Sequence, residues 1–270
     1  MATVLTQFEL SELLWIGVAV FLLGVGKGGF PLGGLAMPIL ILMWPDPALA
    51  ARIVVAFMLP LLCGMDLVSL LFYRRHVRWS TIVPLIPGTL AGVALASALF
   101  VSDTTALIAV SDRILQVLIG GIGIAFVGFR AANAWILRQV TAAEVSANPG
   151  RWRAAILGFA AGLLSTLSHA AGPAAIIYFV PQRLGKLGLA GTMVAFFWGL
   201  NLIKLAPFGL LGRLQTGNLM LALLMAPMIP LGVGTGYALV RLLQERSYIG
   251  LVYAALLVTS GMLIHRAVSG

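Results

Sequence analysis

The stretch LGVGKGGFP, residues 23–31, interrupts the first apolar segment of the chain, and LSTLSHAAGP, residues 164–173, interrupts another at the corresponding place in the second half. Glycine and proline end helices within runs that are otherwise apolar. Paired interruptions of this kind mark the substrate site in transporters that are built from internal repeats. The two breaks therefore predict a duplicated fold and the location of its binding site.

The composition is that of a membrane protein. Hydrophobic residues make up 61% of the chain, charged residues only 9%, and the mean hydropathy is +1.06. Residues 81–101 and 214–240 contain no Asp, Glu, Lys, Arg or His, and about 20 apolar residues in a helix cross a bilayer. Strands of a membrane barrel would alternate apolar and polar residues, which these continuous runs do not. The sequence predicts an all-α polytopic membrane protein.

About ten hydrophobic segments follow one another along the chain. The first, second, sixth and seventh are short for full spans and are joined by glycine and serine, which favours a broken or re-entrant helical hairpin at the start of each half. The predicted segments are residues 10–26, 30–44, 49–73, 80–101, 113–137, 153–168, 172–182, 187–211, 216–241 and 247–265.

The two halves of the chain align with an offset of about 140 residues. Lys27 meets His169, and the tripeptide VAF occurs at both 55–57 and 194–196. Because each half holds five segments, an odd number, the second half enters the membrane from the opposite side, and the repeats are predicted to be inverted. The predicted parts are a first transmembrane repeat, a cytoplasmic linker and a second transmembrane repeat, at residues 1–138, 139–152 and 153–270.

The basic residues orient the chain, because loops rich in Lys and Arg lie on the cytoplasmic side. With ten segments, most of them fall on one face: Arg74, Arg75, Arg78, Arg138, Arg151, Arg153, Arg183, Lys186, Arg241 and Arg246. The prediction is a multi-pass protein of the cell (inner) membrane with both termini extracytoplasmic. The net charge of +9 is spread over short loops, which does not favour nucleic-acid binding.

Ionisable side chains inside the predicted spans are candidates for function, because each costs at least about 2.5 kcal/mol unless it has a partner or water. They are Lys27, Asp66, His169 and Lys204. Lys27 lies among Gly26, Gly28 and Gly29, and unshielded amides beside an ammonium are typical of an anion site. The structural alternative is a lysine that extends to water from a tight turn.

The second break offers Ser168 and His169 at the corresponding place. An imidazole titrates near physiological pH, so His169 either binds the anion when protonated or passes a proton as the site changes access; a packing histidine is the structural alternative. Asp66 and Lys204 occupy matching repeat positions, and Asp66 is predicted to neutralise Lys204 or another cation across the pseudo-twofold axis, unless it is a protonation site coupled to transport. Asn201 shares the helix face of Lys204 and either contacts the substrate or ties helices together.

Enzymatic chemistry has little support in the sequence. Cys63 is the only cysteine, and no metal-ligand cluster, phosphate-binding loop or nucleophile motif is present. We predict no cofactor, no metal and no catalytic residues. Two alternatives to a transporter remain: a small-anion channel, which has the same cationic lining without an obligatory conformational cycle, and an intramembrane enzyme that uses Asp66, His169 and Cys63.

The order of these motifs resembles the sulfite exporter TauE/SafE family. The resemblance is carried by residues 24–30 (GVGKGGF), by the basic loop after the third segment, and by residues 158–162 (GFAAG) leading to Gly172-Pro173. It implies a membrane transporter for sulfite, sulfonates such as sulfoacetate, or other small organic anions. Export of a monoanion is favoured by a negative-inside potential, whereas uptake requires a proton or sodium ion as partner. The stretch SHAA at 168–171 departs from the family pattern, which commonly has more glycine there.

Overall fold

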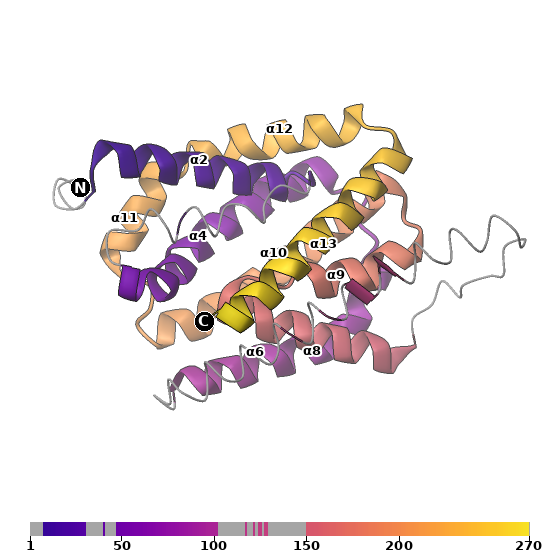
Figure 1. Cartoon of the computed structure of the whole chain (residues 1–270), viewed down its shortest axis with the longest axis horizontal. Helices are drawn as coiled ribbons and strands as arrows, with labels where there is room; N and C mark the ends of the chain where they lie inside the picture. The colour runs from indigo at the N-terminus through magenta and orange to yellow at the C-terminus, as the bar shows by residue number, and fades with distance from the viewer. Residues whose placement is uncertain are drawn as a thin grey trace, which may run out of the picture. The chain divides into compact units, whose positions relative to one another are not determined.

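The computed structural model (Figure 1) describes residues 8–30, 47–101 and 150–269, together with residues 40, 117, 121, 124, 125, 127 and 128. Within these residues every regular element is a helix, as the sequence predicts. The predicted second and fifth segments, and the linker before Gly150, lie almost entirely outside the described residues.

The helices follow the other predicted segments, and their ends differ from the predicted ones by a few residues at most, apart from an internal break in the ninth segment. They are α2 (Leu10–Lys27), α4 (Pro47–Tyr73), α5 (Trp79–Ile82), the 3₁₀ turn η2 (Val83–Leu85), α6 (Ile86–Val101), α8 (Arg151–Ser168), α9 (Gly172–Phe179), the 3₁₀ turn η3 (Val180–Gln182), α10 (Gly185–Leu210), α11 (Thr216–Met225), α12 (Met228–Leu242) and α13 (Glu245–Ser269).

Several of these helices are long and apolar enough to cross a membrane. The described residues contain four such helices, or five if the bent pair α11 and α12 forms one span. The pair is bent by 51°, where the sequence predicts a single run over 216–241. The break falls at Pro227, which has no backbone N–H to continue a helix. The count of ten segments and the inverted orientation of the repeats remain predictions.

The helices form two compact units that interleave along the sequence. The first unit comprises Met1–Arg78 and Lys186–Gln244, and the second comprises Trp79–Gly185 and Glu245–Gly270. Each unit takes helices from both halves of the chain, so neither coincides with a predicted repeat. The assignment of residues 1–138 and 153–270 to repeats therefore rests on the sequence alone.

In the first unit, α2 runs along α12 (Figure 1). Glycines of the two helices face each other at this contact. A Cβ on Gly24 would lie 3.0 Å from the Cα of Gly232, and a Cβ on Gly236 would lie 2.9 Å from the Cα of Gly28. Small residues four positions apart let two helix backbones approach closely in a membrane. This contact fixes the C-terminal end of α2 against α12.

In the second unit, α6 packs along α8 in the same manner. A Cβ on Gly92 would lie 2.8 Å from the backbone nitrogen of Leu163, and a Cβ on Gly158 would lie 3.2 Å from the carbonyl carbon of Leu85. Each glycine contact joins the first segment of one half with the fourth segment of the other half. A duplicated chain is expected to show this equivalence.

An apolar core holds α2 against α4 and α11 in the first unit. Its fully buried members include Ile16 and Val20 on α2, Phe57 and Met65 on α4, and Leu221 on α11. On α4, Met65 directly precedes Asp66, so the core and the candidate site share one stretch of this helix. The packing therefore fixes where Asp66 lies on α4.

The glycine contact generates a test on α12. Gly236→Ala is expected to destabilise the protein by about 1–3 kcal/mol, because the added methyl group overpacks the contact with α2. Gly234→Ala is the matched control, since nothing lies within 4 Å of a Cβ at that position and alanine favours the helix by up to about 1 kcal/mol. Thermal unfolding in detergent checks both; equal stabilities would contradict the packing.

Candidate functional site

The first break ends α2 directly after Lys27. Gly29 has a φ of 101°, a left-handed conformation that glycine adopts without strain. The amides of Gly28 and Gly29 donate to the carbonyls of Gly24 and Gly26, at 2.7 and 3.0 Å. The predicted anion nest of free amides at Gly26, Gly28 and Gly29 therefore needs correction, because the donors of Gly28 and Gly29 close the end of α2 instead.

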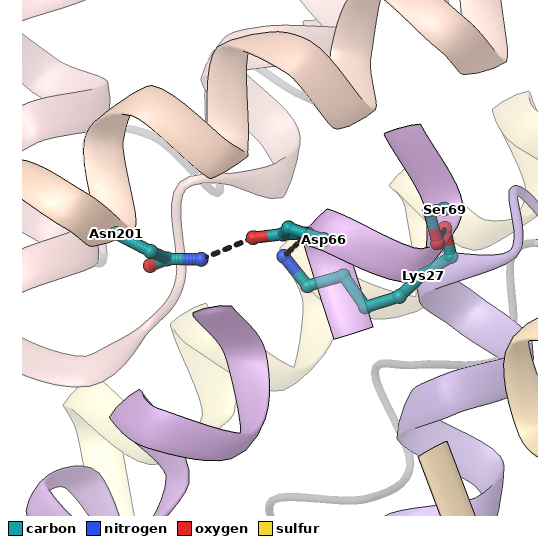
Figure 2. Close-up of polar contacts among 4 residues, drawn as sticks. All are labelled: Lys27, Asp66, Ser69 and Asn201. Atoms are coloured by element: carbon teal, nitrogen blue, oxygen red, sulfur yellow. Dashed lines mark hydrogen bonds and ion pairs between the residues drawn. The ribbon is translucent and has the colours of Figure 1, made fainter. Parts of the chain in front are cut away.

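The side chain of Lys27 forms a buried ion pair with Asp66 of α4 (Figure 2). Its Nζ lies 2.8 Å from Oδ1 of Asp66, and the two side chains are 14% and 0% exposed. The ammonium also lies over the ring of Phe197 on α10, 4.8 Å from the ring centroid. A cation held by a carboxylate and an aromatic face is well stabilised away from water.

Asp66 is also bound from α10. The side-chain amide of Asn201 donates to its Oδ2 at 2.6 Å, and Asn201 is itself buried. Lys204 follows three residues later on the same face of α10 and is fully buried, within electrostatic reach of Asp66 and Lys27. The cluster of Lys27, Asp66, Asn201 and Lys204, referred to below as the charged cluster, thus joins α2, α4 and α10.

Two hydroxyl groups of α4 bind the backbone at the break. The hydroxyl of Ser69 donates to the carbonyl of Lys27 at 2.8 Å, and the hydroxyl of Tyr73 donates to the carbonyl of Gly28 at 2.7 Å. Asp66, Ser69 and Tyr73 are spaced by three and four residues, so they share one face of α4. This face holds both the side chain of Lys27 and the backbone that carries it.

The ion pair that the structure shows for Asp66 is with Lys27, whereas the sequence favoured Lys204. Both lysines contribute to the electrostatic environment of Asp66, but Lys27 reaches the carboxylate because α2 ends beside α4. Sequence reasoning also missed Ser69, Tyr73 and Phe197. The helical spacing from Asp66 was the signal that would have identified the two hydroxyl residues.

The second break lies in the second unit and is built differently. His169 caps the C-terminus of α8 in a left-handed conformation, with φ 54°, and its amide donates to the carbonyl of Ser165 at 3.1 Å. Histidine is among the non-glycine residues that adopt this conformation more often than most. The side chain of Ser168 lies outside the described residues. A joint role of Ser168 and His169 with Lys27 remains a prediction.

Membrane-capable helices with a buried ion pair at a helix break are typical of a multi-pass membrane transport protein. The family model described as Sulfite exporter TauE/SafE matches residues 13–263, and the chain belongs to this family. The match confirms the resemblance in the sequence and implies a membrane exporter of sulfite or a related anion. No curated protein and no solved structure matches the chain significantly. In the part of the chain that the structure describes, no group of three or more His, Cys, Asp or Glu residues could hold a metal ion.

The ion pair generates a stability test. Asp66→Asn is expected to lower the free energy of unfolding by about 3–5 kcal/mol, because it leaves the ammonium of Lys27 without its buried partner. An asparagine at this position still accepts the hydrogen bond from Asn201, so the loss reports the charge. Thermal unfolding of the detergent-solubilised variant measures it.

The double variant Lys27→Met/Asp66→Asn is the control, because it removes both charges. It is expected to recover most of the stability that Asp66→Asn loses, because the effects of substitutions at two residues in contact are not additive. Lys27→Met is measured as the second single variant. If the stability lost by the double variant equals the sum of the losses of Asp66→Asn and Lys27→Met, the two residues do not form a direct ion pair.

Proposed function

We propose that the protein is a secondary transporter that exports a small sulfur-containing anion, such as sulfite, a sulfonate or sulfoacetate, across the cytoplasmic membrane by alternating access. The observation that carries this proposal is the ammonium of Lys27, held at a helix break by a buried carboxylate in a chain of the TauE/SafE family. A cation in this position is costly to keep in an apolar interior and is typical of a substrate or ion pathway.

An anion that binds Lys27 has to share or replace the carboxylate of Asp66, because that carboxylate lies only 2.8 Å from Nζ. Replacement would remove the ion pair between α2 and α4 while Asn201 still holds Asp66 toward α10. A ligand that binds one conformation more tightly than another shifts the equilibrium toward the first. Anion binding would therefore shift the equilibrium between two arrangements of these helices.

The rest of the charged cluster favours an anionic substrate. Lys204 adds a second lysine amine on α10, and an anion bound near both lysines would favour the protonated form of this buried group. The amide of Asn201 can donate to an oxyanion as it donates to the carboxylate of Asp66. Ser168 and His169 are the proposed counterpart in the second repeat.

Export needs no coupled ion in this proposal. A negative-inside membrane potential drives a monoanion outward by about 2.3 kcal/mol per 100 mV, whereas uptake would require a proton or sodium ion. A channel differs in having no conformational cycle. Flux that is saturable and stimulated by substrate on the opposite side of a vesicle supports the transporter and rejects the channel.

Binding at Lys27 is tested by ligand-induced stabilisation. Sulfite, sulfate, thiosulfate, sulfoacetate, taurine, sulfolactate and acetate are each added to the detergent-solubilised protein, and thermal unfolding is recorded. The substrate is expected to stabilise the wild type by about 2.7 kcal/mol at one hundred times its dissociation constant. Lys27→Met is expected to lose this stabilisation, because the anion no longer meets a cation.

Lys186→Met is the matched control. The ammonium of Lys186 lies in the same unit and donates to the backbone carbonyls of Arg241 and Leu243, and Lys186 is not part of the charged cluster. This variant is expected to keep the anion response of the wild type, each response being measured against the same variant without anion. Stabilisation that persists in Lys27→Met, or that fails for every anion tested, would contradict the proposed site.

A further inference from the structure

The C-terminal end of α2 needs partners for its backbone carbonyls. The last four carbonyls of a helix receive no hydrogen bond from a backbone N–H of the same helix. In a membrane, each polar group that is left without a hydrogen bond is costly. Ser69 and Tyr73 of α4 donate to the carbonyl of Lys27, the last residue of α2, and to that of Gly28, which directly follows it. The end of α2 is therefore bound to α4 through its backbone as well as through the side chain of Lys27.

Tyr73 is tightly packed beside the C-terminal end of α2. It is fully buried, and its ring meets Tyr237 of α12 edge to face at a centroid distance of 5.1 Å. A Cβ on Gly29 would lie 2.7 Å from the Tyr73 hydroxyl oxygen, and a Cβ on Gly191 of α10 would lie 3.0 Å from the Cβ of Tyr73. Two glycines thus make room for one tyrosine, and its hydroxyl is directed at the break.

The position of the Lys27 ammonium depends on this backbone. A lysine side chain has several rotatable bonds, so its Nζ is placed accurately only where its backbone is fixed and its end is held. Asp66 holds the end, and the two hydroxyl groups bind two successive peptide groups, the one between Lys27 and Gly28 and the one between Gly28 and Gly29.

We propose that Ser69 and Tyr73 are positioning residues of the anion site, which act through the carbonyls of Lys27 and Gly28 to present the Lys27 ammonium to the substrate. The inference rests on the proposed function. Neither hydroxyl touches the substrate; each acts by holding the backbone that carries the binding residue.

The test compares Ser69→Ala and Tyr73→Phe with matched variants that remove the same groups elsewhere. Ser97→Ala and Tyr178→Phe delete hydroxyls that donate to the carbonyls of Val93 and Thr81 in the second unit. The readout is KM and kcat for sulfite efflux from proteoliposomes, with the dissociation constant for sulfite measured in detergent. Ser69→Ala and Tyr73→Phe are each expected to raise KM about threefold to tenfold with little change in kcat, and the controls are expected to leave KM unchanged.

One further variant separates positioning from general stability. Ser69→Thr keeps a hydroxyl and is expected to retain the KM of the wild type. If Tyr73→Phe does not fold, the Ser69→Ala and Ser69→Thr pair carries the test alone.

The outcomes distinguish this inference from the proposed function. If Lys27→Met abolishes sulfite binding while Ser69→Ala and Tyr73→Phe match their controls in KM, the positioning role is overturned and the proposed function stands. If Lys27→Met binds sulfite as the wild type does, the proposed site fails and the positioning role fails with it.

Discussion

A charge inside an apolar helical bundle has to be compensated where it lies, and the ion pair between Lys27 and Asp66 meets this constraint. Both side chains are largely or fully buried, and their charged atoms lie 2.8 Å apart. Moving either charge out of water costs several kcal/mol, which the pair recovers only with good geometry and additional hydrogen bonds. Asn201 supplies one such bond to Asp66. The first unit is arranged so that three helices meet at this carboxylate.

Close helix packing makes that meeting possible. The glycines of α2 and α12 allow the two backbones to approach, and the apolar core places α2 against α4. Between helices in lipid, packing and polar contacts stabilise association where the hydrophobic effect does not. The end of α2 is therefore fixed by van der Waals contact along its length and by polar contacts at its break. An anion that takes over Lys27 acts on the polar contacts alone and leaves the glycine packing in place.

Much of the fold is predictable from local sequence, and less of the site. Long uncharged runs predict membrane helices, and the glycines at 28 and 29 predict the end of α2, because these signals need no tertiary information. The family resemblance is confirmed by the match over residues 13–263. The partner of Asp66 depends on how α2, α4 and α10 are rotated against one another, which spacing along the chain does not specify. Likewise, the sequence does not specify which carbonyls accept from the amides of Gly28 and Gly29, and these acceptors are known only from the structure.

In the proposed transport cycle, the substrate anion and the carboxylate of Asp66 compete for the ammonium of Lys27. The most direct measurement is the dissociation constant for sulfite, by calorimetric titration at low temperature, of the wild type and of Asp66→Asn. Competition predicts tighter binding to Asp66→Asn, since the variant removes the competing carboxylate, and no binding to Lys27→Met/Asp66→Asn. Equal or weaker binding of sulfite to Asp66→Asn would show that the anion does not compete with this carboxylate for Lys27.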